Sequence, residues 1–212
     1  MNTNDLIANL ANKATTVKPM KKPSYLILQF LGFSVIYYTL IQPYIGIRGD
    51  IFVKFSQPFF AIEITLILLL FLSCLIAAVL TIYPDNYQKT FLLKFPYLVL
   101  ALLVVFFSVE IFTQNQENSA LIFGHSYQCS LCVASFAVIP ALYFFYILHK
   151  GANLNPFQGG AFAAIAASSL SAIALRIGEA NDSFSHFVIW HYLPILVFSL
   201  IGAFLGKQIF KW

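Results

Sequence analysis

The sequence predicts an all-α integral membrane protein with six transmembrane helices, and three observations lead to this fold class. First, 60% of the 212 residues are hydrophobic and only 9% are charged, whereas a soluble domain carries about 25% charged residues. So few charges would leave large apolar patches in water, which soluble monomers avoid. Second, the apolar residues form six runs close to the length of about 20 residues that a helix needs to cross a bilayer. Third, these runs are apolar on every side, whereas the strands of a transmembrane barrel alternate.

Prolines and glycines separate the six predicted spans and place short polar connectors between them. The predicted spans cover residues 25–43, 61–83, 95–112, 129–148, 158–175 and 188–210. The connectors cover residues 45–58, 84–94, 113–128, 149–156 and 176–187. We therefore expect two parts, a cytoplasmic partner-binding segment of residues 1–23 and a six-helix transmembrane domain of residues 24–212.

The distribution of basic residues predicts the orientation of the chain in the membrane. Six crossings bring both termini to the same side, and nine of the twelve lysines and arginines fall on that side. The other three are Arg48, Lys54 and Arg176, and most of the acidic residues lie with them. Because basic residues collect in cytoplasmic loops, both termini are expected in the cytoplasm. Topology therefore accounts for the net charge of +4, and no direct binding of nucleic acid is expected.

Residues 2–16 have the pattern of a short amphipathic helix ahead of the first span. Apolar side chains recur at spacings of three and four residues, namely Leu6, Ile7, Leu10, Ala11 and Ala14. An isolated helix of this length is marginal in water, so it needs a surface to pack against. That surface is the bilayer, the loops of the bundle or the groove of a protein partner; otherwise the segment is a solvated leader. Helices on lipid surfaces carry lysine and arginine along their polar face, whereas asparagine dominates here, which favours a protein partner over lipid.

Two cysteines mark the outer end of the fourth predicted span. Cys129 and Cys132 form a Cys-x-x-Cys motif in a compartment that permits disulfides, and residues three apart share a helix face. These thiols could form a disulfide or bind a soft metal ion, with His125 one turn earlier as a third ligand and His186 as a fourth. Cysteine is also a small apolar filler of helices, which is the role expected of Cys74 in mid-span.

Two glutamates, Glu63 and Glu110, lie inside the predicted spans close to their outer ends. Ionisable groups within a membrane are costly and therefore often functional. An ion pair between Glu63 and one of the outer basic residues is the simplest interpretation. No charge is predicted at mid-depth, which argues against an ion-coupled transporter. His149 and His191 are expected to be interfacial residues and not ligands.

The last two predicted spans each carry a stripe of small residues. These are Gly160, Ala164, Ser168 and Ala172 in the fifth span, and Gly202 and Gly206 in the sixth. Small residues let helix backbones approach closely where lipid provides no hydrophobic drive between helices. We therefore expect both stripes to be helix-packing faces.

The opening stretch TNDLIANLANKATTVKPMKKP resembles the N-terminus of the NrsF family, the negative regulators of sigma-F. The matching positions are Thr3, Asp5, Leu6, Ile7, Leu10 and Val17, with Thr16 in place of the proline of the family pattern. Farther along, Lys150, Gly151, Ala152, Leu154 and Pro156 match a basic-Gly-Ala-x-Leu-x-Pro turn. The ending FVIWHYLPILVFSLIGAFLGKQIFKW is also similar to that of the family, so the resemblance covers nearly the whole chain.

The resemblance implies a membrane-embedded anti-sigma factor of the bacterial inner membrane. Its N-terminal segment, through the six matching residues, would sequester an extracytoplasmic-function-type sigma factor and release it on periplasmic metal or redox stress. The resemblance also implies sensing by outer cysteines, of which Cys129 matches the first, while Arg176-Ile177 stands at the second. Cys132 is the candidate replacement for that second cysteine, and His125 is a further candidate residue of the sensing site. Glu63 matches a position where the family usually has a glutamate.

Two other classes of function remain open. A quinone-linked thiol oxidoreductase would use the same Cys-x-x-Cys, but it would need a second outer thiol pair, and only Cys74 remains. A small transporter would need a polar path, for which the spans offer only serines and glycines. No phosphate loop, hydrolase triad or nucleotide motif is found in the sequence, so we expect neither an enzyme nor a cofactor. The expected partners are the sigma factor and the lipid bilayer.

Overall fold

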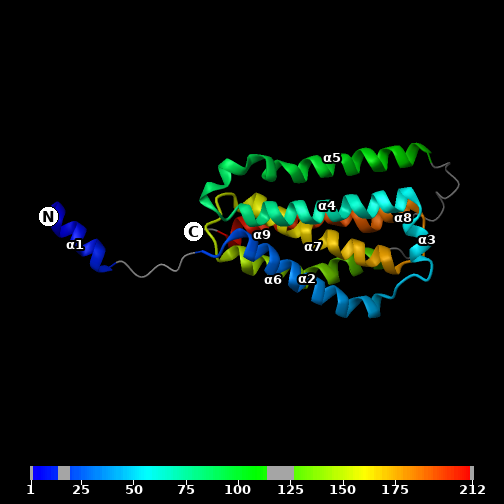
Figure 1. The fold of residues 1–212 in the computed structure, drawn as a ribbon, viewed down its shortest axis with the longest axis horizontal. Coiled ribbons are helices and arrows are strands. Elements are labelled where there is room, and N and C mark those ends of the chain that lie inside the picture. Colours follow the sequence, from blue (N-terminus) through cyan, green and yellow to red (C-terminus); the bar gives the residue numbers. More distant parts are fainter. Residues whose placement is uncertain (1, 14–19, 114–126, 211–212) are drawn as a thin grey trace.

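The computed structural model describes residues 2–13, 20–113 and 127–210, and the regular elements in these ranges are helical. In chain order they are α1 Thr3–Lys13, α2 Pro23–Ile45, α3 Ile51–Phe55, α4 Pro58–Leu80, the 3-10 turn η1 Pro84–Lys89, α5 Thr90–Thr113, α6 Tyr127–His149, α7 Pro156–Gly178, α8 Phe184–Phe187, the π-helical turn η3 Val188–Tyr192 and α9 Leu193–Ile209. Six helices are long and apolar enough to cross a membrane, and they form one bundle (Figure 1). The prediction of an all-α protein with six spans is confirmed.

Proline sets where several of these helices begin. Pro23, Pro58 and Pro156 each lie in the first turn of a long helix, where the missing N–H costs nothing and the fixed φ suits a helix. The predicted first, second and fifth spans therefore start two or three residues too late. The prediction for the third span was further off, because the turn that begins at Pro84 leads directly into α5 and the expected start was residue 95. The second span also ends earlier than predicted, at Leu80.

The first helix, α1, precedes the bundle and lies apart from it in Figure 1. The N–H of Leu6 donates to the carbonyl oxygen of Asn2 at 3.1 Å, and Asp5 lies in the first turn, where the helix dipole favours negative charge. The predicted helix is confirmed to Lys13, and residues 14–16 lie outside the described residues.

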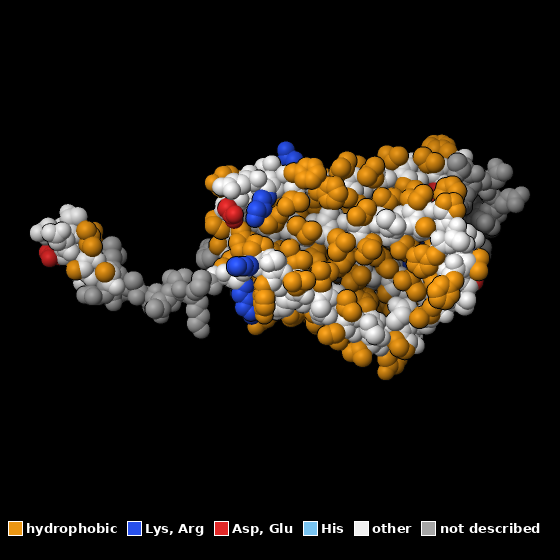
Figure 2. All heavy atoms as spheres, in the orientation of Figure 1, with side chains coloured by type: hydrophobic (Ala, Val, Ile, Leu, Met, Phe, Trp, Pro, Cys, Tyr) orange, Lys and Arg blue, Asp and Glu red, His pale blue; other side chains and the backbone are white. Residues whose placement is uncertain are grey.

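The bundle has two distinct ends, which we name for reference. At the N-terminal end, α2 begins and α9 ends (Figure 1). At the opposite end, which we call the distal end, lie α3 and α8 (Figure 1). Figure 2 shows that hydrophobic side chains cover most of the visible side of the bundle, while lysine and arginine side chains gather near the N-terminal end. An apolar side between polar ends is the distribution expected for helices that face lipid.

The central helix of the bundle is α7, which packs against α9, α4 and α6. Its closest approach is to α9, where a Cβ atom on Gly160 would collide with the carbonyl oxygen of Gly202 and would lie 2.8 Å from the Cα of Gly206. The small-residue stripes are therefore helix-packing faces, as predicted. This packing fixes the start of α7 against the last turns of α9.

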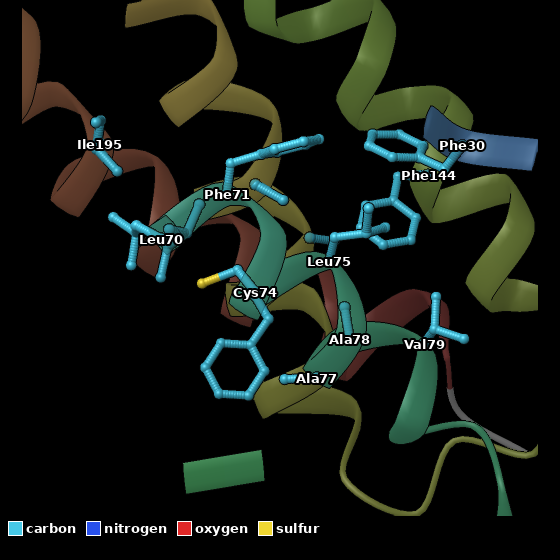
Figure 3. Close-up of a cluster of buried hydrophobic side chains, with 14 of the residues drawn as sticks. Phe30, Leu70, Phe71, Cys74, Leu75, Ala77, Ala78, Val79, Phe144 and Ile195 are labelled. Atoms are coloured by element: carbon cyan, nitrogen blue, oxygen red, sulfur yellow. The ribbon is translucent and has the colours of Figure 1, made fainter. Parts of the chain in front are cut away.

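Aromatic and aliphatic side chains fill the middle of the bundle (Figure 3). The rings of Phe30 in α2 and Phe144 in α6 stack with their centroids 4.2 Å apart, and both are fully buried, as is Leu75. Cys74 is fully buried in the same cluster (Figure 3), which is the packing expected of an apolar filler.

Candidate functional site

Buried side chains that can carry charge gather at the distal end of the bundle. Each of the following is less than one tenth exposed: Arg48, Glu63, Arg176, His186 and His191. Such residues are rarely buried unless they are paired, so their presence in one place indicates an interacting network. The network has two parts, one built on the two arginines and one built on the two histidines.

Arg48 ties the connector between α2 and α3 to the loop that follows α7. Its Nε and Nη2 donate to Asp50 at 2.7 and 2.9 Å, and its Nη1 and Nη2 donate to Asp182 at 3.0 and 3.1 Å. Nη1 also donates to the carbonyl oxygen of Glu179 at 3.2 Å. Burial acts to raise the pKa of Asp182, but hydrogen bonds from Arg48 and Lys54 outweigh burial and hold that pKa well below its ordinary value. The bond from Arg48 Nη1 fixes the backbone of Glu179 at the end of α7.

Arg176, in the last turn of α7, pairs with Glu63 in the second turn of α4. The Nε of Arg176 lies 3.2 Å from Oε1 of Glu63, and its Nη2 lies 3.2 Å from Oε2. The hydroxyl of Tyr192 donates to the same carboxylate. The guanidinium carbon of Arg176 also lies 3.8 Å from the ring centroid of Phe187, a cation–π contact. Glu63 is therefore a buried partner in an ion pair, which is the simplest of the roles considered for it.

Cys129, Glu179, His186 and His191 form the second part of the network, which we call the distal tetrad. One potential ligand atom of each residue lies within 4.8 Å of the ligand atoms of the other three. The Nε2 atoms of His186 and His191 are 3.0 Å from Oε1 and Oε2 of Glu179 respectively. These contacts lack hydrogen-bond angles, so His186 Nε2 and both ring nitrogens of His191 have no hydrogen-bond partner. One sulfur, two nitrogens and a carboxylate are thus collected in one place.

Burial and neighbouring charges set the ionisation of the tetrad residues that lie outside the spans. Burial lowers the pKa of His186, which favours the neutral imidazole. Burial acts to raise the pKa of Glu179, but its close contacts with His191 and His186, together with the charge of Arg176, leave that pKa lowered. Glu179 and His186 therefore place a carboxylate beside a neutral imidazole.

The π-helical turn η3 positions His191 beside Cys129. Pro194 follows this turn and has no N–H, so the carbonyl oxygen of Trp190 is left without its helical donor. It accepts instead from the hydroxyl of Ser130 in α6, at 2.8 Å. Because Ser130 is adjacent to Cys129 in the chain, this bond holds the start of α6 against η3. Single π-helical turns are rare and often occur at functional sites.

The structure brings Cys129 to the histidines rather than to Cys132. Both cysteines are free thiols that are partly buried, and Cys132, one turn farther along α6, is not part of the distal tetrad. His186, expected from the sequence as a fourth ligand, joins the tetrad, whereas His125 lies outside the described residues. A sensing role for Cys129 and Cys132 stays a prediction.

Sequence reasoning did not find Glu179 as a member of this group, and it expected His191 to be an interfacial residue, whereas His191 is buried among these side chains. His186 and His191 are five positions apart, and on a regular α-helix their side chains would point about 140° apart. Their spacing therefore carries no ligand signal, and only the short α8 and the π-helical turn bring them together. The one available signal is that Glu179, His186 and His191 fall within thirteen positions, between the last two long helices.

The residues predicted to bind a partner lie at the other end of the molecule. Thr3, Asp5, Leu6 and Ile7 lie in α1, as does the backbone of Leu10. The placement of Val17 lies outside the described residues. Within the described part of this segment, Leu6 and Ile7 of the apolar stripe of α1 are exposed.

The fold and the two polar regions define a multi-pass helical membrane protein with a buried ionic network at its distal end and an exposed amphipathic helix beyond its N-terminal end. The family model NrsF, described as "Negative regulator of sigma F", matches residues 10–212. This match spans nearly the whole chain, and the protein belongs to the NrsF family. At the family level it is a negative regulator of a sigma factor, so a sigma factor is its partner. No curated protein and no solved structure matches the chain.

Proposed function

We propose that this protein is an anti-sigma factor of the bacterial inner membrane that holds an extracytoplasmic-function-type sigma factor at the cytoplasmic face through residues 1–23. A metal or redox stress on the periplasmic side releases the sigma factor. The observation that carries this proposal is the exposed apolar stripe of α1 in a chain of a family that regulates a sigma factor negatively. The protein acts as a regulator and not as an enzyme.

The helix α1 has the properties of a segment that docks into a groove. Leu6 and Ile7 lie on its apolar stripe and are 42% and 59% exposed. Its eleven residues are too few for a stable isolated helix in water. An amphipathic helix of this kind gains its stability when it lays the apolar face into a groove of a partner. Thr3, Asp5, Leu10 and Val17, the other positions at which the sequence resembles the opening of the family, complete the proposed contact surface.

The charges at the two ends of the bundle support a cytoplasmic position for both termini. At the distal end, Arg48, Lys54 and Arg176 are each paired with a carboxylate. Six described lysines lie at or near the N-terminal end, namely Lys21, Lys22, Lys89, Lys94, Lys150 and Lys207. The positive-inside rule assigns the more basic end to the cytoplasm, so the distal end faces the periplasm in this proposal.

In the proposed mechanism, α7 links the two ends. Its last turn carries Arg176 of the distal network. Its first turn follows the connector at Gly151, where a Cβ atom would lie 2.6 Å from side-chain atoms of both Ile82 and Met20. Met20 is three residues ahead of α2, on the path to α1. A signal that shifts α7 at the distal end would therefore act next to the segment that binds the partner, which provides the two coupled sites that allostery requires.

Substitutions in the apolar stripe test capture by α1. The double variant Leu6→Asp, Ile7→Asp should derepress a sigma-dependent reporter, as should deletion of residues 2–16, while an immunoblot of the membrane fraction shows unchanged protein. Asn9 lies on the exposed polar face of the same helix, so Asn9→Asp is the matched control and should repress like the wild type. Unchanged repression in the stripe variant would refute the proposal.

Cysteine variants separate a regulator from a thiol oxidoreductase. Cys74 is buried in the core and is not available as part of a second outer thiol pair. A variant with both Cys129→Ser and Cys132→Ser should still repress the reporter and lose only its response to metal or oxidant. If this variant instead loses repression together with a membrane thiol-oxidation activity, the oxidoreductase is favoured.

A further inference from the structure

We propose that the distal tetrad of Cys129, Glu179, His186 and His191 binds one divalent metal ion of the zinc class. This inference does not depend on the proposed function, since a metal site at the distal end would exist whether or not α1 binds a sigma factor. It differs from the pair of cysteines suggested by the sequence, because Cys132 is not among the ligands.

The distances within the tetrad suit a small metal ion. Zinc binds nitrogen, oxygen and sulfur at about 2.0–2.3 Å in a tetrahedron, which places its ligand atoms about 3.3–3.8 Å from one another. The ligand atoms of the tetrad all lie within 4.8 Å of one another, and the two imidazole–carboxylate distances are 3.0 Å. The ligand atoms therefore lie within about 1–1.5 Å of the spacing that a tetrahedral zinc site needs.

A buried ring nitrogen of His191 is a second observation that points to a ligand. His191 is 1% exposed, and its Nδ1 has no hydrogen-bond partner, while the Nε2 atoms of His186 and His191 contact only the carboxylate of Glu179, at 3.0 Å and without hydrogen-bond geometry. Buried polar atoms are nearly always satisfied, and each exception requires an explanation. A metal bond to one nitrogen of each ring supplies a partner of the kind that imidazole most often has at such sites.

The chemistry of the donors selects the class of metal. Calcium and magnesium prefer oxygen ligands throughout, whereas a set of thiolate, two imidazoles and a carboxylate suits zinc and related ions. The thiolate of Cys129 and the carboxylate of Glu179 supply two negative charges, which a divalent ion neutralises. Four protein ligands also complete a tetrahedron, and closed sites of this kind are structural rather than catalytic.

Two surrounding hydrogen bonds hold the segments that carry the ligands. Arg48 holds the backbone of Glu179, and the bond from Ser130 to Trp190 joins the start of α6 to η3. Outer contacts of this kind orient metal ligands. A bound ion would therefore join α6, the loop after α7 and the α8–η3 segment at the distal end.

Metal titration of the purified full-length protein in detergent tests the site. After chelation, the wild type should bind one Zn²⁺ per chain by elemental analysis, and Co²⁺ should produce a thiolate charge-transfer band. Cys129→Ser should remove this band. Glu179→Gln and His186→Gln should each weaken metal binding by more than about tenfold, because removal of a group that only hydrogen-bonds to a metal ligand already costs about that much. Cys132→Ser and His149→Gln, a cysteine and a histidine outside the tetrad, are the matched controls and should bind like the wild type.

Thermal unfolding provides a second measurement that does not require every variant to bind. Zn²⁺ should raise the unfolding midpoint of the wild type and of Cys132→Ser, but not that of Glu179→Gln, which preserves the shape of the side chain. Failure of the wild type to bind Zn²⁺ or Co²⁺ stoichiometrically would overturn the proposal. Equal loss of binding in Cys132→Ser and Cys129→Ser would also overturn it, in favour of a cysteine-pair site. Neither result would bear on capture of a sigma factor by α1.

Discussion

Arg176 and Glu63, which are 113 positions apart, form a two-point ion pair inside the distal end of the bundle. Only 7% and 10% of their side chains are exposed. Tyr192 donates to the same carboxylate, so a single glutamate joins α4, α7 and the π-helical turn ahead of α9. The position of α7 at the distal end is therefore set by charge as well as by apolar packing.

Arg176→Met should destabilise the bundle strongly. Removal of the guanidinium leaves Glu63 charged in a buried site, and breaking a buried pair in this way costs about 3–5 kcal/mol. The unfolding free energy in detergent measures the loss. Adding Glu63→Leu should recover much of it, because an apolar pair leaves no uncompensated charge. An Arg176→Met protein as stable as the wild type would show that the pair does not stabilise the fold.

Arg48→Lys should also be destabilising, although it keeps the charge. Arg48 donates five hydrogen bonds to two carboxylates and one carbonyl oxygen, whereas a lysine has three donors on one nitrogen. We expect a loss of about 1–3 kcal/mol in the free energy of unfolding. Lys54 also contacts Asp182 but is more accessible to solvent. The control variant Lys54→Arg should therefore change the free energy of unfolding by less than about 1 kcal/mol. Equal effects of the two variants would contradict the central role of Arg48.

Gly160→Ala should weaken the contact between α7 and α9. The added Cβ would meet the backbone of Gly202 and Gly206, which cannot move aside as a flexible side chain can, and overpacking costs about 1–3 kcal/mol. Gly32 lies inside α2, and a Cβ atom added there would have no neighbour within 4 Å, so Gly32→Ala is the matched control. It should be neutral or slightly stabilising, since alanine favours the helix. Thermal unfolding of both variants in detergent distinguishes them.

Acid should weaken the distal network through Asp182. Its pKa in the folded protein is held below the ordinary value of 3.8, so its contribution to stability is fully present above the pKa of the unfolded chain. This contribution is lost as the pH falls from about 4 through the lower, folded pKa, because the unfolded state binds the proton first. The unfolding midpoint should therefore drop below about pH 4, and less so in Asp182→Asn. Asp85→Asn, at the N-terminal end, should follow the wild type; an unchanged acid response in Asp182→Asn would exclude this carboxylate as the cause.

The sequence predicted the features that depend on local composition. A run of about 20 apolar residues identifies a span wherever it occurs, and small residues at four-residue spacing identify a packing face, so the six spans and the two packing faces were predictable. The amphipathic α1 was predictable because its apolar residues repeat with the period of a helix. The predicted starts of the helices were less accurate. At Pro84, for example, the sequence predicted a polar connector, whereas the chain forms a 3-10 turn that continues directly into α5.

Only the tertiary structure decided which polar groups meet at the distal end. Three basic residues were equally available to Glu63, and the packing of α4 against α7 selected Arg176. The Cys-x-x-Cys spacing drew attention to Cys132, whereas the bond between Ser130 and Trp190 places Cys129 next to His191. Span length and charge distribution are properties of short segments, so the sequence by itself determined the architecture. The partners of a buried charge depend on groups brought together from distant segments, and a single π-helical turn is enough to change which of them face one another.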